Sequence, residues 1–447
     1  MSAAQPWAEA FRERAPTLAG AGLPWLAETR RRALDRFVAE GWPSTRSDAW
    51  RHTSLLSLEH ERFVAPAADA PQRSAVQLRT AVDALREGDA AGHWWVFVDG
   101  CHAPALSSPG ALPDGAEVAS LARILEQTPG RAESHFGAAE DGHAPAALNT
   151  AFAADGAFVH LRRGVVVEAP IHLVFFGATA HAAIHVRNLV VAEAGAQATI
   201  VEHHVKVHDE PLLSNVVTRV DCADDARITH LKLQQDSERA VHLARIEARQ
   251  ARGSMFASHS LSFGARLARN DIVTRFDGTG CEALFNGLYH VDGKRHVDHH
   301  TVIDHAEPHG TSREFYRGIL DDAGRGVFAG RIVVAPGALR TDAVQRTDNL
   351  LLSRQAEADA RPELEIYADD VKCAHGATVG RIDESALFYL RSRAIDEERA
   401  RNLLTWAFAA ESLARIGIAS LQRRARAALL ARLPGGAVLD RALEELR

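Results

Sequence analysis

The chain has 447 residues, 46% of them hydrophobic and 24% charged, which is the composition of an ordinary globular protein. Its 51 basic and 58 acidic residues give a net charge of −7. This argues against a nucleic-acid binder, which needs a basic excess to neutralise phosphates. No window approaches 18 uncharged apolar residues, so no membrane helix is expected, and the N-terminal run becomes charged before an apolar signal core could form. The four cysteines lie far apart and form no C-x-x-C pair, which favours free thiols in a reducing cytoplasm.

Residues 1–150 are predicted to form a mixed, mostly helical N-terminal domain. Ala33, Leu34, Phe37 and Val38 form an apolar stripe with helical spacing after Pro24. Within the same region, residues 94–99 read as a buried strand.

Residues 151–390 form a second region, rich in short strands separated by Gly, Asp or Asn. The expected strands lie at 165–167, 171–176, 184–191, 199–207, 215–220, 227–233, 256–263, 272–276, 282–289, 311–320, 331–334 and 350–353. Many short strands are typical of a sandwich, a barrel or a β-solenoid. A solenoid grows by adding coils, so the length of this region favours it, although no strict repeat is visible.

The region 391–447 is predicted to be a helical C-terminal domain. Asp396 can cap a helix whose apolar stripe includes Ala400, Leu404 and Phe408, and Gly417 can end it. An arginine-rich helix follows to about residue 433, and we expect it to expose Arg423, Arg424 and Arg426.

Three common catalytic motifs do not occur in the sequence: the G-x-x-x-x-G-K-[ST] phosphate loop, a G-x-G-x-x-G turn after a strand, and the G-x-S-x-G elbow. The chain is therefore expected to have no ATPase site, dinucleotide site or serine-hydrolase site of its own.

Histidines and acids gather between residues 290 and 309, and three interpretations remain open. Imidazole and carboxylate together can hold iron or zinc, or the histidines can pack along a wet strand edge. Asp298, Asp304 and Glu307 can also be interpreted as the acid/base set of a β-helix carbohydrate-active enzyme. The histidines are His290, His296, His299, His300, His305 and His309.

A second candidate site is the pair Cys373 and His375, which follows an acidic turn at Asp369 and Asp370. Residues i and i+2 of an extended chain point to the same side, so both groups could face one surface. They would then be metal ligands, or a buried thiol beside a hydrogen-bonded imidazole.

The run from His300 to Ile395 resembles the SufB/SufD family of iron–sulfur cluster assembly proteins, and within it the D type, SufD. The resemblance covers about residues 40–430 and is strong from 300 to 410. The matching segments are Ser44–Thr53, His305–Ser312, Tyr316–Gly318, Gly326–Val334, Asn349–Ser353, Phe388–Arg393 and the long E-I-x-A-D-D-V-K-C-x-H-G-A-T run that ends at Thr378.

The sequence departs from the family pattern in two ways. Ile366 stands where SufB-type members carry their scaffold cysteine, which favours the D type. Arg317 and Ala394 replace the more usual Lys and Gly at positions that we interpret as turns.

The resemblance implies a right-handed parallel β-helix flanked by helical terminal domains, in a non-catalytic subunit. Such a subunit pairs with a SufB-type scaffold and docks a SufC-type ABC ATPase through its C-terminal helices, here Phe408 and the arginines 423, 424 and 426. It implies that His375 is a ligand of a transient iron–sulfur cluster or iron at that interface, whereas the isolated chain binds no cofactor firmly. Cys373 would be a second ligand or would only pack, and packing is preferred.

Two other interpretations compete with this one: the carbohydrate-active enzyme and a self-contained metal-binding protein. In isolation the chain could also pair with itself. No nucleic acid and no membrane are expected as partners.

Overall fold

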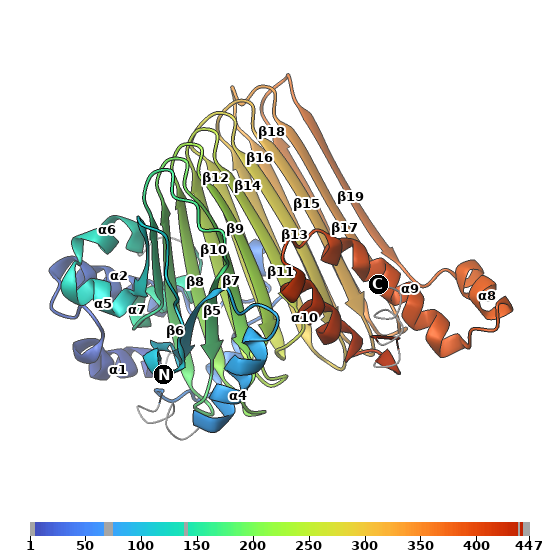
Figure 1. The fold of residues 1–447 in the computed structure, drawn as a ribbon, viewed down its shortest axis with the longest axis horizontal. Coiled ribbons are helices and arrows are strands. Elements are labelled where there is room, and N and C mark those ends of the chain that lie inside the picture. Colours follow the sequence, from blue (N-terminus) through green and yellow to red (C-terminus); the bar gives the residue numbers. More distant parts are fainter. Residues whose placement is uncertain (1–4, 67–74, 138–141, 437–438, 441–447) are drawn as a thin grey trace.

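The computed structural model describes residues 5–66, 75–137, 142–436 and 439–440. Two long sheets face each other and form a β-solenoid, with helical segments at both ends of the chain (Figure 1). The fold class predicted from the sequence is thereby confirmed. No helix of the described residues is both long and apolar enough to cross a membrane.

The first sheet has ten strands and the second has nine, and each strand pairs in parallel with the one a coil away, except at one end. The first sheet runs β19 (Lys372–Gly380), β17 (Asp342–Leu351), β15 (Thr311–Leu320), β13 (Glu282–Val291), β11 (Met255–Ser262), β9 (Arg227–Gln235), β7 (Gln197–Val205), β5 (Ile171–Phe176), β1 (His93–Val98) and β2 (Cys101–His102). The second sheet runs β18 (Glu357–Ile366), β16 (Arg325–Val334), β14 (His296–His305), β12 (Leu267–Phe276), β10 (Val241–Gln250), β8 (Leu213–Cys222), β6 (Ala183–Ala192), β4 (Ala157–Leu161) and β3 (Ala116–Ser120).

The repeat of the solenoid is conformational rather than a repeat of sequence. Successive strands of the first sheet from β7 to β19 begin 27 to 31 residues apart. A residue with left-handed backbone follows β6, β8 and β10 at the same point of each coil, namely Gly195, Asp225 and Gly253. Gly and Asp tolerate this conformation, so different sequences make the same corner.

Side chains that point between the two sheets form the main core, which we call the lumen. Columns of lumen residues stack across strands in register. One such column consists of Ala198, Ile228, Phe256, Ala283, Ser312, Ala343 and Cys373.

Helices cover parts of both outer faces. The C-terminal helices α9 (Glu397–Ala414) and α10 (Ala419–Leu430) pack on the outer face of the first sheet, against residues such as Leu231, Leu261 and Leu288. The N-terminal helices α2 (Pro24–Glu40) and α7 (Ala144–Phe152) pack on β6, β8 and β10 of the second sheet. The other helices are α1 (Gln5–Arg14), α4 (Ala75–Arg86), α5 (Leu121–Gln127), α6 (Gly130–Phe136) and α8 (Glu384–Ser392).

The two ends of the solenoid differ. At the closed end, β2 and β3 pair antiparallel with β1 and β4, and β2 is only two residues long. At the other end, β18 and β19 each pair with one strand only, within the part of the chain that the structure describes. We call the edge formed by β18 and β19 the open end, and α8 lies beyond it (Figure 1).

Candidate functional site

Cys373 and His375 lie on β19, the last strand of the first sheet, and their side chains share its lumen face. Cys373 is in register with Ala343 and His375 with Gln345, and both partners are buried in the lumen. Since no further coil covers β19, His375 is exposed and Cys373 is half-buried. The expectation that the two side chains face one surface is therefore confirmed. The exposure of His375 comes from its place on the edge strand, not at the end of a strand.

Among the described residues, no strand pairs with the outward N–H and C=O groups of β19. The Lys372 N–H donates to the Thr341 carbonyl on the side of β17. Because residues of a parallel strand alternate in the neighbour that they bond, the N–H groups of Cys373, His375 and Ala377 point away from β17. The open end thus presents a thiol, an imidazole and a strand edge with no strand neighbour among the described residues.

A buried polar column lies directly beneath His375 in the lumen. Glu314, Gln345 and His375 are in register on β15, β17 and β19. The Gln345 amide donates to the Glu314 carboxylate, whereas the Gln345 carbonyl oxygen is buried with no partner among the described residues. Burial raises the pKa of Glu314 to about 7, partly offset by the hydroxyl of Thr301 and the Gln345 amide.

The open end offers few side chains that could bind a metal ion. Burial raises the pKa of the Cys373 thiol, which packs against the lumen core, so metal binding there must first remove a proton. In the described part of the chain, no group of three or more His, Cys, Asp or Glu side chains is placed to hold a metal ion.

The histidines between 290 and 309 do not form one site, because strand alternation and the turns separate them. His299 and His305 point into the lumen, and His296 and His300 lie on the outer face of the second sheet. The others are elsewhere: His290 on the outer face of the first sheet and His309 in a turn with φ of 62°. The interpretation of this group as a single metal site is therefore wrong.

Asp298, Asp304 and Glu307 are too far apart to act together as the acid and base of a glycosidase. Asp298 and Asp304 are six residues apart on one face of β14, or about 20 Å. Paired glycosidase carboxylates are at most about 9.5 Å apart. Asp304 pairs with Arg275 at 3.1 Å, and Glu307 is exposed in the following turn. The carbohydrate-active alternative based on these three residues is therefore wrong.

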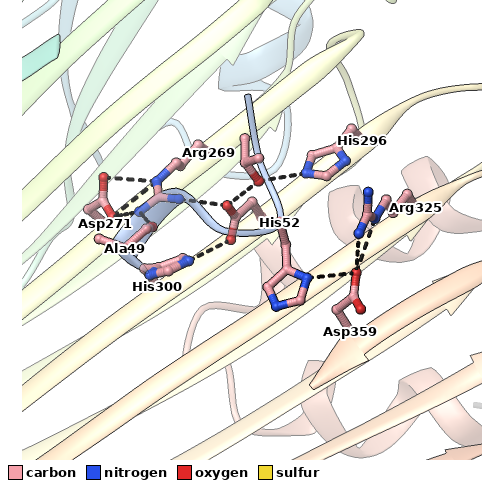
Figure 2. Close-up of polar contacts among 10 residues, drawn as sticks. Ala49, His52, Arg269, Asp271, His296, His300, Arg325 and Asp359 are labelled. Carbon is pink, nitrogen blue, oxygen red and sulfur yellow. Dashed lines mark hydrogen bonds and ion pairs between the residues drawn. The ribbon is translucent and has the colours of Figure 1, made fainter. Parts of the chain in front are cut away.

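Asp298 has a structural role beneath an N-terminal segment, residues 48–53, which we call the strap. Figure 2 shows strap residues Ala49 and His52 beside Arg269 and His300 of the second sheet. The Asp298 carboxylate accepts from the Thr53 hydroxyl at 2.5 Å and from Arg269 at 2.7 Å, and Asp298 and Arg269 are almost fully buried. Burial alone would raise the pKa of Asp298, but His300 and Arg269 hold it well below its usual range. The Arg269 guanidinium also stacks 3.7 Å from the Trp50 ring.

The strap continues across the second sheet to the last coil. His52 lies 3.4 Å from Asp359 on β18, and Asp48 is 2.9 Å from Arg361 on the same strand (Figure 2 shows the first of these contacts). Segments 300 residues apart in sequence are thus joined at the open end. The Trp-basic-His-Thr run in Ser44–Thr53 was recognised only as part of the family resemblance, and it gives no indication of which residues the strap contacts.

The C-terminal arginines are less exposed than expected. Only Arg423 is exposed. Arg424 donates to main-chain carbonyls of Ala84 and Glu87, at the C-terminal end of α4, where a cation complements the helix dipole. Arg426 is buried and pairs with Asp440 at 2.9 Å. The prediction of three exposed arginines is therefore wrong, because two of them hold α10 against its own chain.

Two large aromatic side chains lie next to each other and exposed on α8, a surface that the sequence pattern did not indicate. Phe388 is 74% exposed and Tyr389 57% exposed, whereas the predicted contact residue Phe408 is half-buried beneath the Arg317 guanidinium. The F-Y-L-x-S-R run belongs to the segments that resemble the family, but its periodicity does not indicate which face of the helix is exposed. Two adjacent exposed aromatic rings are typical of a protein-binding surface.

Comparison with known proteins is consistent across the chain. A model described as "SUF system FeS cluster assembly, SufBD core domain" matches residues 175–408, and one described as "SufBD protein N-terminal region" matches residues 1–173. The iron–sulfur cluster assembly protein SufD of Escherichia coli is 32% identical over 418 residues, 90% of this chain and 92% of the relative. A SufBD family protein of Synechocystis is 31% identical over 412 residues, 90% of each chain, and SufD of Bacillus subtilis is 27% identical over 413 residues, 90% of this chain and 92% of the relative.

Proposed function

Because the chain belongs to the SufBD family of iron–sulfur cluster assembly proteins of the SUF system, we propose that it is the non-catalytic, SufD-type subunit of a cytoplasmic scaffold complex. In this proposal it pairs through its open end with a SufB-type subunit and docks a SufC-type ATPase through its C-terminal helices. The cluster is cargo of the complex, built at the junction and then released.

The proposal rests mainly on one observation: β19 has both a hydrogen-bonding edge without a strand neighbour and two side chains of types that bind metals. Its outward-pointing N–H groups and the side chains of Cys373 and His375 lie on the same edge strand, which pairs only with β17 among the described residues. An incoming strand could extend the first sheet by hydrogen bonding, as in other strand-addition interfaces. A partner coil would at the same time cover the lumen and bring its own side chains over His375.

The number of donors supports a shared site. Iron–sulfur clusters are commonly held by four protein ligands, whereas this end offers one thiol and one imidazole. We propose that His375 supplies a ligand and that the partner supplies the others, with Cys373 packing against the lumen core or binding second. An imidazole among the ligands would hold iron less firmly than a full thiolate set and so suits a cluster that must leave.

The docking surface for the ATPase includes α8 in this proposal, together with the exposed residues of α9 and α10. Phe388 and Tyr389 provide the apolar centre, and the exposed Arg423 remains a candidate contact. The buried Arg426 acts only by holding the helix in place.

Strand pairing is tested by Ala377→Pro, with Ala377→Ser as matched control. Proline removes an N–H that points away from β17, and edge strands tolerate it, so the chain should fold with nearly unchanged melting temperature. After co-expression with the SufB-type and SufC-type subunits, native mass spectrometry should show loss of the heterodimer for proline only. Pairing of wild-type affinity by Ala377→Pro would show that β19 does not form the junction.

A further inference from the structure

One row of side chains on the outer face of the first sheet joins strands β15, β17 and β19. Arg317, Asp348 and Thr378 are register partners on these three strands. The Thr378 hydroxyl donates to Asp348 at 2.6 Å, and Arg317 Nε lies 3.9 Å from the other carboxylate oxygen. Asp348 is buried and also accepts from Arg346 at 2.8 Å. This buried carboxylate therefore ties the edge strand to its two neighbours.

Arg317 extends the row to helix α9. Its guanidinium donates to the main-chain carbonyl of Phe408 and to the carboxylate of Glu411. It also lies between two aromatic rings, 4.8 Å from the centre of Phe315 and 4.7 Å from that of Phe408. A planar guanidinium can make all of these contacts together, which an ammonium group cannot.

The position of Arg317 corrects the sequence interpretation. Tyr316 to Gly318 lie in the middle of β15, not in a turn, so the Arg at this position affects more than local turn geometry. Ala394, in contrast, does lie in a turn after α8, with φ of 63°.

The row meets β19 three residues from His375. Thr378 is on the outer face, whereas Cys373 and His375 are on the lumen face of the same strand. In the described structure β19 has β17 as its only strand neighbour. The Thr378–Asp348 contact therefore adds a side-chain link on the outer face of β19 to the backbone ladder with β17.

We propose that Arg317, acting through Asp348 and Thr378, is a positioning residue that locks β19 to helix α9. The strand that carries His375 and the helix of the ATPase-docking region then move as one unit. The roles of the two ends rest on the proposed function, whereas the lock itself is a property of this chain alone. The lock provides a direct physical route by which an event at the docking helices reaches the junction.

The test uses exposed residues at the two ends of the row, so that the variants fold. Glu411→Ala removes the carboxylate of α9 that binds Arg317. Thr378→Val removes the hydroxyl that links β19 to Asp348 while keeping a β-branched side chain. Arg317→Met removes the charge at the centre and keeps an apolar stem between the rings. The matched control is Arg313→Met, which breaks an exposed pair with Asp342 across β15 and β17, 2.9 Å apart.

The measurement is amide hydrogen exchange of the full chain, followed in peptides from residues 371–380 and 400–414. Glu411→Ala should speed exchange in β19 several-fold, although Glu411 does not touch that strand, and Thr378→Val should speed exchange in α9. Arg317→Met should affect both peptides, and Arg313→Met neither. Unchanged β19 exchange in Glu411→Ala, or an equal change in the control, would overturn the lock, whether or not Arg317→Met folds.

A second measurement separates this inference from the proposed function. Adding the SufC-type ATPase to the wild-type chain should protect both peptides, and adding it to Thr378→Val should protect α9 alone. If the ATPase protects neither peptide in the wild type, the docking assignment fails, while the partner-free exchange rates still decide the lock.

Discussion

Glu314 is a buried carboxyl whose ionisation should make the stability of the protein depend on pH. Its side chain is in the lumen, 2% exposed, and its amide partner Gln345 is the residue beneath His375. Burial raises its pKa from 4.5 to about 7. The group therefore prefers to be neutral in the folded state, and ionising it opposes folding.

The direction and size of this pH dependence follow from the linkage between proton binding at Glu314 and folding. Between pH 4.5 and 7 the folded chain holds a proton at Glu314 that the unfolded chain has lost, so the free energy of unfolding falls as pH rises. One pKa unit corresponds to about 1.4 kcal/mol, so the loss reaches about 3 kcal/mol by pH 8. The stabilising contribution is complete below pH 4.5 and disappears as pH passes 7.

Glu314→Gln cannot ionise and should lack this slope. Denaturant unfolding of both proteins at pH 5, 6, 7 and 8 should show the variant gaining about 2 to 3 kcal/mol relative to wild type between pH 5 and pH 8. The test compares how the free energies of unfolding of the two proteins change with pH, not their values at one pH. An amide and a carboxylic acid differ in hydrogen bonding at every pH, so a constant offset between the two proteins is expected. Glu282→Gln, at an exposed position on β13, is the matched control. Parallel curves for Glu314→Gln and wild type would refute the reasoning.

Three further outcomes are expected. His375→Ala should change stability by no more than roughly 0.5 kcal/mol, because the side chain is exposed. The assembled complex should nevertheless lose its cluster, with Cys373→Ser milder, and wild-type iron content in the His375 variant would remove its ligand role. Phe388→Ala should weaken ATPase binding in a titration without lowering the melting temperature, and unchanged affinity would exclude α8 from the docking surface. Thr53→Val should lower the free energy of unfolding by about 1 to 3 kcal/mol, because buried Asp298 loses a hydrogen-bond donor. An unchanged denaturation midpoint would show that the strap contributes little.

Most strands with apolar outward residues could be predicted from the sequence, whereas several with charged ones could not. The expected strand 171–176 is β5 itself, which is buried along its whole length. Among the strands that were not predicted, the short β2, β3 and β4 lie at the closed end, and β10, β14 and β18 carry charged residues on their outer faces that pair between coils. Arg275 on β12 and Asp304 on β14 are an example, and such a pair can be recognised only when these two strands, whose first residues are 29 apart, are aligned.

The two residues of the candidate site could be predicted from the sequence, but their position on the last strand of the solenoid could not. Cys373 and His375 were identified from their spacing and from the resemblance, yet nothing local to them shows that β19 is the final strand. The buried positions of Arg426 and Arg317 depend on partners in other segments. Asp440 lies 14 residues beyond Arg426, after the end of α10, and Glu411 lies 94 residues beyond Arg317, on α9. Charge patterning alone gives no reason to place them inside.

The difference between the two ends of the solenoid limits how far such chains can polymerise. A stack of parallel coils with two free edges could add copies head to tail without limit and form a fibre. Here β2 is only two residues long and β3 pairs antiparallel with β4, so among the described residues the long parallel edges lie at β18 and β19. Joining two such solenoids through these long edges leaves a two-residue strand and a short antiparallel strand at each outer end, which disfavours the addition of a third member.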